Sequence, residues 1–214
     1  MGVKSSIFIL SEKEYEGALN LSCIKINFLK KEINLSKYDA LIFSSKNGVL
    51  AIDKLTKSWK NIPSYSIGGA TSKVINSLGG KVIYEAKSSY GDNFAKEIKD
   101  RLKGKKILFL RAKVVTSNLN EILLKAGVKL YELVVYETRC NDCKELKTPP
   151  LNSVIIFSSP STIECFFRCF SWESSYKAVV IGSKTASFMP KDISFVLAPK
   201  QSINSCIELS KKLL

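Results

Sequence analysis

Ile42-Phe43-Ser44-Ser45, followed later by Ile67-Gly68-Gly69-Ala70-Thr71, forms a passage that occurs twice in this chain. The second copy reads Ile156-Phe157-Ser158-Ser159 and then Ile181-Gly182-Ser183-Lys184-Thr185, and in both copies the second isoleucine lies 25 positions after the first. Each copy has an apolar strand that ends in hydroxyl residues and a second strand that ends in Ile-Gly before a threonine that opens a helix. The repeat therefore predicts parallel α/β structure in both halves of the chain.

The same passages predict where a ligand binds. They mark the carboxyl ends of strands, where ligands of parallel α/β sheets sit. Loop amides and helix N-termini point outward at these ends and favour anions. We expect the two edges to face each other and to clamp one anionic ligand.

Length and composition describe a globular protein. With 214 residues, 45% of them hydrophobic and 24% charged, the chain can form one large or two small domains with cores of their own. No run approaches the roughly 20 apolar residues of a membrane span. The apolar stretch within Met1–Leu10 is too short for a signal peptide. We therefore expect a cytoplasmic protein with no membrane partner.

The net charge of +14 leaves three interpretations open. Lysines spread along helix faces, such as Lys96, Lys99 and Lys103, are usually solvated. A nucleic-acid partner would also explain the charge, but no recognition helix, zinc-finger spacing or RNP-like strand is present. A polyanionic small substrate is the third interpretation, since a positive field would concentrate it in a cleft. We expect a small-molecule partner and no nucleic acid.

The absence of histidine and of two cofactor-binding motifs limits the chemistry of the site. The chain has no histidine, which excludes a histidine-based triad. Gly68-Gly69-Ala70-Thr71 lacks the third glycine of the dinucleotide fingerprint, and a phosphate-binding Gly-Lys-Ser/Thr loop is absent. We expect no cofactor, and hydroxyl, amide, tyrosine, lysine and carboxylate groups in the site.

Four of the six cysteines form two close pairs, Cys140 with Cys143 and Cys165 with Cys169. Their spacing is loosely similar to a four-thiolate zinc site, and the first pair also suits a redox role. The second pair falls in an expected helix after Ser161, where such positions look like ordinary core. We expect free thiols, which a reducing cytosol would maintain, and no metal.

Strand and helix patterns alternate along the chain. The expected strands are 6–10, 23–28, 40–43, 64–67, 81–84, 107–110, 128–138, 154–157, 178–181 and 193–197. The expected helices are 14–19, 49–59, 72–78, 94–102, 119–126, one after Ser161, and 203–213.

The order of these elements predicts a discontinuous domain. Only three strands follow the polar linker 139–152, so the N-terminal strand must supply the fourth. We therefore expect an α/β protein with two parallel-sheet domains, joined by a two-stranded β-ladder hinge, with the active site in the inter-domain cleft. The first domain takes residues 1–30 and 141–214 and the inserted second domain takes residues 36–130. The linker strands are 22–35 and 131–140.

Seven short motifs, in this order and spacing, resemble the uroporphyrinogen-III synthase family over nearly the whole chain. They are Leu41-Ile42-Phe43-Ser44-Ser45, Ile67-Gly68-Gly69-Ala70-Thr71, Leu110-Arg111, Val134-Val135-Tyr136-Glu137-Thr138, Phe157-Ser158-Ser159-Pro160-Ser161, Ile181-Gly182-Ser183-Lys184-Thr185 and Ala198-Pro199. The resemblance implies a cofactor-free lyase of tetrapyrrole (haem) biosynthesis, which we expect to be a monomer. It would cyclise hydroxymethylbilane, a linear tetrapyrrole with eight carboxylates, to uroporphyrinogen III with inversion of ring D.

The resemblance also implies roles for individual residues. Tyr136 matches the family's Val-Tyr tyrosine and would assist departure of the hydroxyl; packing on the ladder is its alternative role. Ser45, Thr71, Ser161 and Thr185 would bind substrate carboxylates, and the two threonines also suit helix N-caps.

Two places depart from the family pattern. Lys46-Asn47 replaces the usual Pro-Arg, and Ala112 replaces the glycine that usually follows Arg111. A surface ion pair is therefore as good an interpretation of Arg111 as a role in the site. Two other functions stay open: a non-catalytic two-lobed binder of a polyanionic small molecule, and a nucleic-acid-associated domain.

Overall fold

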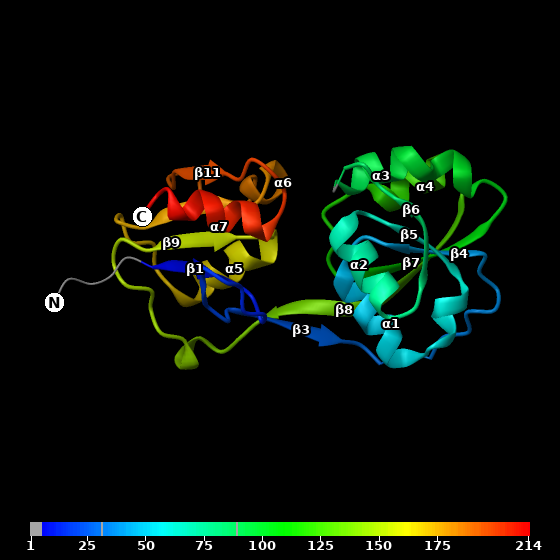
Figure 1. Ribbon diagram of the computed structural model, residues 1–214, viewed down its shortest axis with the longest axis horizontal. Helices are drawn as coiled ribbons and strands as arrows, with labels where there is room; N and C mark the ends of the chain where they lie inside the picture. Colours follow the sequence, from blue (N-terminus) through cyan, green and yellow to red (C-terminus); the bar gives the residue numbers. More distant parts are fainter. Residues whose placement is uncertain (1–5, 31, 89) are drawn as a thin grey trace. The chain divides into compact units, whose positions relative to one another are not determined.

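The computed structural model describes residues 6–30, 32–88 and 90–214 and divides the chain into two compact α/β units (Figure 1). Unit 1 combines Met1–Ile26 with Thr138–Leu214, and unit 2 is the continuous segment Asn27–Glu137. Both are built on parallel sheets, so the predicted two-domain α/β fold with one discontinuous domain is confirmed.

The larger sheet has six strands. Their order is β3(Ile24–Phe28), β8(Lys129–Cys140), β7(Lys106–Ala112), β4(Ala40–Phe43), β5(Pro63–Ser66) and β6(Lys81–Glu85). Strands β4 to β8 pair in parallel. Strand β8 is much longer than its neighbours, and its last residues, from Thr138, belong to unit 1.

Helices cover both faces of this sheet. They are α1(Lys46–Leu55), α2(Gly69–Ser77), α3(Gly91–Ile98) and α4(Leu119–Lys125), with 3₁₀ turns η1(Ser58–Asn61) and η2(Lys99–Leu102). Successive side chains of β4 point to opposite faces of the sheet because the strand is pleated. Ile42 belongs to the core cluster that includes Phe94 of α3 and Leu123 of α4. Phe43 packs instead against Trp59 of η1, with ring centroids 5.9 Å apart.

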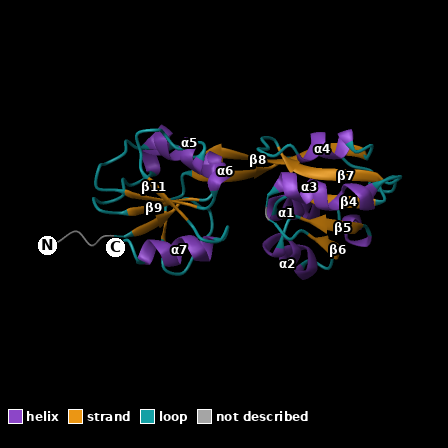
Figure 2. Cartoon of the chain, turned by 90° about the horizontal axis from the view of Figure 1, so that it is seen from above, coloured by secondary structure: helices purple, strands orange, loops and turns teal. Residues whose placement is uncertain are grey.

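Unit 1 has a five-stranded parallel sheet. Its order is β11(Phe195–Leu197), β10(Lys177–Val180), β9(Val154–Phe157), β1(Ile7–Ile9) and β2(Leu19–Asn20). Figure 2 shows α5(Pro160–Cys169) and α6(Ser183–Ala186) on one side of this sheet and α7(Ile203–Lys211) on the other. The core clusters agree, since Phe157 packs with Phe166 of α5 whereas Ile156 packs with Ile207 of α7.

Strands β3 and β8 both run from one unit into the other. Leu29 donates its amide to the Val135 carbonyl at 2.9 Å, and Asn141 donates to the Cys23 carbonyl at 2.9 Å. Residue numbers rise on one strand as they fall on the other, so the pairing is antiparallel. The predicted two-stranded ladder is therefore present.

The helix expected at 14–19 is wrong. This segment turns at Gly17, whose φ of +83° lies in the left-handed region that favours glycine. Tyr15 and Ala18 then form an antiparallel bridge, and β2 follows as a parallel strand beside β1. The spacing of apolar residues over so short a segment could not distinguish a turn from a helix.

The expectation of free thiols is also wrong for four cysteines. Disulfides join Cys140 to Cys165 and Cys143 to Cys169, at Cα–Cα distances of 5.1 and 5.0 Å. Strand β8 extends to Cys140 and brings the first pair beside α5, where the second pair lies one helical turn apart. Their pairing is a tertiary contact that sequence spacing did not indicate.

Cys23 and Cys206 are free and buried. Burial raises the pKa of Cys23 to about 12 and that of Cys206 to about 11. Both thiols therefore stay protonated and unreactive at neutral pH.

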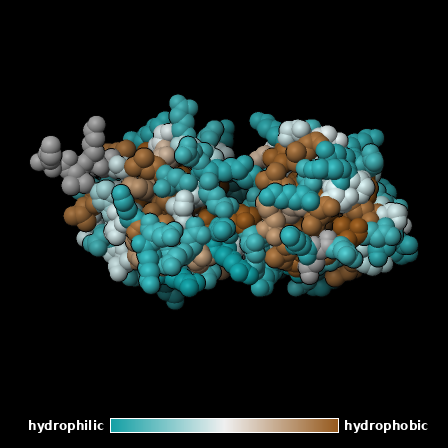
Figure 3. Space-filling view, turned by 90° about the horizontal axis from the view of Figure 1, so that it is seen from below, coloured by the Kyte–Doolittle hydropathy of each residue, from teal (hydrophilic) through white to brown (hydrophobic). Residues whose placement is uncertain are grey.

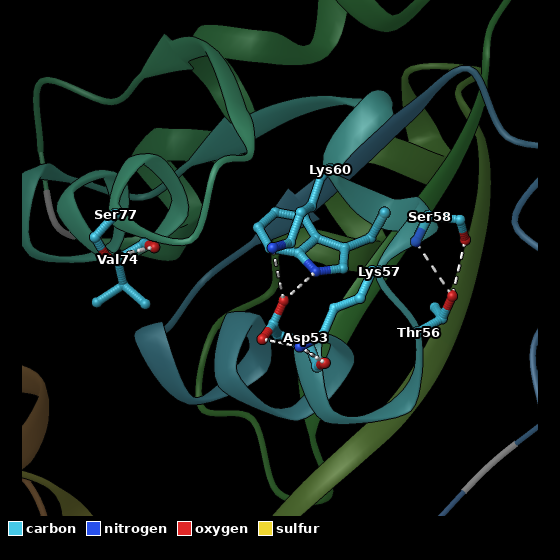
Figure 4. A network of polar contacts seen from close by, with 8 residues as sticks. Asp53, Thr56, Lys57, Ser58, Lys60, Val74 and Ser77 are labelled. Atoms are coloured by element: carbon cyan, nitrogen blue, oxygen red, sulfur yellow. Dashed lines mark hydrogen bonds and ion pairs between the residues drawn. The ribbon is translucent and has the colours of Figure 1, made fainter.

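Hydrogen bonds and ion pairs connect the end of α1 to η1 (Figure 4). Asp53 accepts hydrogen bonds from Lys57 Nζ at 2.5 Å and from the buried Trp59 Nε1 at 3.0 Å, and Lys60 Nζ lies 3.6 Å away. The indole N–H thus has an acceptor inside the core, which such a buried donor requires.

In the part of the chain that the structure describes, no helix is long and apolar enough to cross a membrane.

Candidate functional site

The two repeated passages form two copies of one structural unit. Strands β4 and β9, helices α1 and α5, and strands β5 and β10 match at one constant offset in residue number. Ser45 is the N-cap of α1 and Ser159 is the N-cap of α5. Gly68 and Gly182 are likewise the N-caps of α2 and α6, with closely similar extended backbone angles.

In unit 2 the first copy forms a polar edge at the carboxyl ends of β4 and β5. Ile67 donates its amide to the Phe43 carbonyl at 3.1 Å, which joins the two strand ends. Ser45 Oγ accepts the Asn47 amide at 3.2 Å and caps α1. Thr71 is the third residue of α2, donates its amide to the Gly68 carbonyl at 3.0 Å, and is only 5% exposed.

In unit 1 the second copy repeats this arrangement. Ile181 donates to the Phe157 carbonyl at 3.0 Å, and Thr185 donates to the Gly182 carbonyl at 3.1 Å. Ser159 donates its amide to Thr162 Oγ1 at 3.2 Å, closing the start of α5. Ser161 is the second residue of α5 and half-buried. The offset therefore pairs Ser45 with Ser159, while Ser161 corresponds to Asn47.

The interpretation of Thr71 and Thr185 as helix N-caps is wrong. Glycine holds the cap position in both helices, and neither helix start has a side-chain cap hydrogen bond. Each threonine lies within the first turn of the helix, so capping does not explain the residue type.

Tyr136 lies on β8 beside the polar edge of unit 2. A bulge in β8 places Val135 as an extra residue between the pairs Arg111/Val134 and Ala112/Tyr136. The Tyr136 carbonyl accepts the Lys113 amide at 2.8 Å. Tyr136 is 7% exposed, and the Ser45 side chain is close enough to influence its pKa. Burial raises the pKa of Tyr136 above its ordinary value of 10.0, and the Ser45 side chain opposes that rise.

Helix α1 approaches the end of β7 closely, and this approach requires a glycine. A Cβ at Gly48 would lie 2.9 Å from the Leu110 carbonyl oxygen, so a larger residue would push the helix away. The start of α1, with Ser45, is thereby held against the strand that pairs with β8.

Arg111 is engaged in an ion pair. Its Nε lies 2.5 Å from Glu132 Oε2, and Nη1 donates to the carbonyls of Ala112 and Lys113 at 2.9 and 3.2 Å. The surface ion pair is therefore the better interpretation, and the guanidinium serves to hold the ends of β7 and β8 together.

The chain as a whole carries an excess of positive charge. Lysine and arginine number 33 against 19 acidic residues, and hydrophilic residues cover much of the face drawn in Figure 3 on both units. Within residues 6–30, 32–88 and 90–214 no group of three acidic, histidine or cysteine side chains is placed to hold a metal ion.

The model of the family described as uroporphyrinogen-III synthase HemD matches residues 11–208. The chain belongs to this family. Uroporphyrinogen-III synthase of Synechococcus elongatus is 24% identical over 168 residues, which span 70% of this chain and 63% of that protein's length. The resemblance predicted from the sequence is confirmed.

Solved structures from the same family share the fold. Uroporphyrinogen-III synthetase from Helicobacter pylori 26695 is 28% identical, with a TM-score of 0.83 over 99% of this chain and 100% of that chain. A mutant uroporphyrinogen III synthase from the extremely thermophilic bacterium Thermus thermophilus is 10% identical, with a TM-score of 0.59 over 98% of each chain.

The fold thus distributes the predicted residues over two polar edges. Unit 2 holds Tyr136, Ser45 and Thr71, whereas unit 1 holds Ser161 and Thr185. Sequence reasoning missed the cap residue Ser159, although the repeat itself carried that signal.

Sequence reasoning also missed Glu137, a buried residue that follows Tyr136 on β8. Its carboxylate accepts from Asn27 Nδ2 at 3.1 Å and lies 3.3 Å from Lys113 Nζ. No sequence motif linked Glu137 to Asn27, which lies far away along the chain.

Proposed function

We propose that this protein is a uroporphyrinogen-III synthase that converts hydroxymethylbilane to uroporphyrinogen III with loss of water. The observation that carries the proposal is the buried Tyr136 beside a hydroxyl-bearing sheet edge, in a chain that the family model matches over residues 11–208.

Tyr136 is the proposed proton or hydrogen-bond donor. Burial keeps its pKa above the ordinary 10.0, so the phenol is protonated at neutral pH. A neutral phenol can donate to the departing hydroxyl of the terminal hydroxymethyl group as the carbon–oxygen bond breaks. The resulting electrophilic carbon is attacked from the substituted carbon of ring D, and closure with inversion follows.

Thr71, Ser161 and Thr185 are proposed to bind the substrate's carboxylates. The threonines present hydroxyls within the first turn of a helix, and Ser161 lies in the first turn of α5. Helix N-termini favour anions. The excess of positive charge would attract a substrate with eight carboxylates.

The main contribution to catalysis is then conformational. Hydroxymethylbilane can close without inversion unaided, so the protein must hold the chain in the geometry that favours attack at the substituted carbon. Correct positioning alone can contribute several kcal/mol to a barrier, on the order of 7–11 in well-oriented systems. We further propose that the protein acts as a monomer in the cytoplasm.

An isomer assay tests the proposal. The protein is incubated with freshly prepared hydroxymethylbilane, the products are oxidised, and the porphyrin isomers are separated. We expect the type III isomer in excess over a protein-free control, which gives the non-inverted isomer. If binding is measurable but the isomer ratio equals that of the control, the protein is a binder of polyanions and the proposed activity is wrong.

A further inference from the structure

The sheet of unit 2 has a point at which its strand order reverses. From β4 the chain continues to β5 and β6 on one side, and it then returns to form β7 and β8 on the other side. Ligands of open parallel α/β sheets bind outside the carboxyl ends of the strands at such a reversal. The residues that follow β4 and β7 therefore lie where a ligand is expected. After β4 they include Ser45, for which the sequence predicts carboxylate binding.

Lys113 is the first residue after β7, and two contacts with β8 fix its position. Its amide donates to the Tyr136 carbonyl at 2.8 Å, and its Nζ donates to Glu137 Oε2 at 3.3 Å. The Glu137 side chain is only 8% exposed, and its other oxygen accepts from Asn27 Nδ2 at 3.1 Å. A buried carboxylate thus holds the end of a lysine side chain that is itself 65% exposed.

Lys113 keeps hydrogen-bond donors that a ligand can use. An ammonium group has three protons. Glu137 is its one hydrogen-bond partner among the residues that the structure describes. Arg111, the other cation at this strand end, is only 20% exposed and already donates to Glu132 and to two backbone carbonyls. Lys113 is therefore the cation at the end of β7 that is available to an anion.

The burial of Glu137 distinguishes this ion pair from an ordinary surface pair. Two exposed side chains lose conformational entropy when they pair, and such pairs contribute little. Here Asn27 of β3 holds the carboxylate in place, so the ammonium group is confined to the end of β7 before any ligand arrives. A group that is already confined loses less entropy when it binds.

We propose that Lys113 binds a carboxylate of the tetrapyrrole substrate at the carboxyl end of β7, and that Glu137 is the positioning residue of its ammonium group. This inference rests on the proposed function. It adds a positive charge to the hydroxyl groups assigned to the substrate, and a charge-assisted hydrogen bond is stronger than one from a neutral hydroxyl.

The repeat places a lysine at the equivalent position of unit 1. Strand β1 pairs with β9 as β7 pairs with β4, and matching the ends of these strands matches Lys13 to Lys113. Lys13 is exposed and lies between the exposed residues Glu12 and Glu14. The neighbouring negative charges offset its field, so the proposal is restricted to Lys113.

A charge-removing variant and a matched control test the binding role. Calorimetry measures the Kd for uroporphyrin III, the octacarboxylate formed by oxidising the proposed product, and the isomer assay gives KM and kcat. We expect Lys113→Gln to raise Kd and KM roughly 10-fold with little change in kcat, and Lys113→Arg to keep both near wild type. Lys125→Gln removes an ion-paired lysine at the end of α4, which leads back to the start of β8 at the opposite sheet edge, and should change neither.

Glu137→Gln tests the positioning role. Glutamine can still accept from Asn27, but it does not hold the ammonium group by charge. If only the positive field mattered, loss of this carboxylate would lower KM; we expect KM to rise instead. The double variant Lys113→Gln/Glu137→Gln keeps the net charge and leaves no buried carboxylate without a cation. It should also bind roughly 10-fold more weakly, and it decides the question if Lys113→Gln fails to fold.

Four results would contradict these expectations in different ways. Normal Kd and KM in Lys113→Gln and in the double variant, with type III isomer still formed, would exclude Lys113 from substrate binding. Equal losses in Lys113→Gln and Lys125→Gln would reduce the effect to net charge. A lower KM in Glu137→Gln would refute its positioning role. Absence of the type III isomer with the wild-type protein would instead refute the proposed function on which this inference rests.

Discussion

Thr71 and Thr185 occupy the same position in two helices of the two units. Each is the third helical residue after a glycine N-cap, and each donates its amide to that glycine's carbonyl, at 3.0 and 3.1 Å. Both side chains are nearly buried, at 5% and 7% exposure. Two threonines without a capping role at matched sheet edges are consistent with binding of anionic groups, and this gives the first prediction.

Thr71→Val and Thr185→Val should each weaken substrate binding and leave stability almost unchanged. Valine keeps the shape and the backbone amide but removes the hydroxyl, and the loss of roughly 1 kcal/mol that follows removal of a cap is not expected because neither threonine is a cap. KM should rise with a modest change in kcat, and Thr→Ser should restore KM. Urea unfolding and steady-state kinetics measure both effects; a normal KM in both valine variants would exclude carboxylate binding by these hydroxyls.

Tyr136→Phe should lower turnover by roughly 10- to 10⁴-fold, the range expected for one proton-transfer or hydrogen-bond donor. Phenylalanine keeps the buried ring packed, so the free energy of unfolding should change little, by at most about 1 kcal/mol for the lost hydroxyl. Kinetics of type III isomer formation, with a thermal melt as control, test this. Unchanged turnover would leave Tyr136 only a packing role on β8.

Reduction of the two disulfides should destabilise unit 1 and spare unit 2, because all four cysteines lie within Thr138–Leu214. Closing one loop with a sequence separation of 25 stabilises by about 3.5 kcal/mol in the chain-entropy model, and the second bridge adds less because the loop is already closed. Hydrogen exchange should accelerate in peptides of α5 and β9 after reduction, and remain unchanged in those of β4 and β5.

The paired variant Cys140→Ser/Cys165→Ser serves as the control for the reducing agent. Thiol counting on protein taken from cells under non-reducing conditions shows whether the bridges form there, since a reducing cytoplasm disfavours them. Equal exchange rates in oxidised and reduced protein would show that the bridges do not stabilise unit 1.

The contribution of Asp53 to the free energy of unfolding should depend on pH. Burial alone would raise its pKa, but hydrogen bonds from Lys57 and Trp59 and the charges of Lys57 and Lys60 outweigh it, and the pKa falls below its ordinary 3.8. A lowered carboxylate pKa stabilises the fold above the unfolded value and loses that contribution as pH falls through the folded one. The difference in free energy of unfolding between wild type and Asp53→Asn should therefore be largest near pH 7 and decrease below about pH 4.

Asp53→Ala separates the charge from the hydrogen bond to the indole. It leaves the buried Trp59 N–H without its acceptor, which costs about 1–3 kcal/mol, whereas asparagine can still accept. Urea unfolding at several pH values measures both variants. Equal stability of the alanine and asparagine variants at pH 7 would show that the Trp59 bond contributes nothing.

Much of the fold could be read from hydrophobic period and helix signals. The buried runs Ala40–Phe43 and Val154–Phe157 are strands with the expected bounds, because four consecutive apolar residues before a serine cap suit only a strand covered on both faces. The predictions failed in segments of only a few residues. The segment around Gly17 and strand β2 carry too few residues for a period to distinguish turn, helix and strand.

Local patterns and the repeat visible in the chain were enough to predict the two α/β halves, the discontinuous domain, the hydroxyl-bearing strand ends and the family. Which residues meet depends on tertiary packing. The fold joins Cys140 to Cys165, pairs Arg111 with Glu132 and places both threonines within the first helical turn rather than at the caps. These contacts depend on strand order, on the bulge in β8 and on the close approach at Gly48. Such features arise from packing between segments distant in sequence, and no local pattern records them.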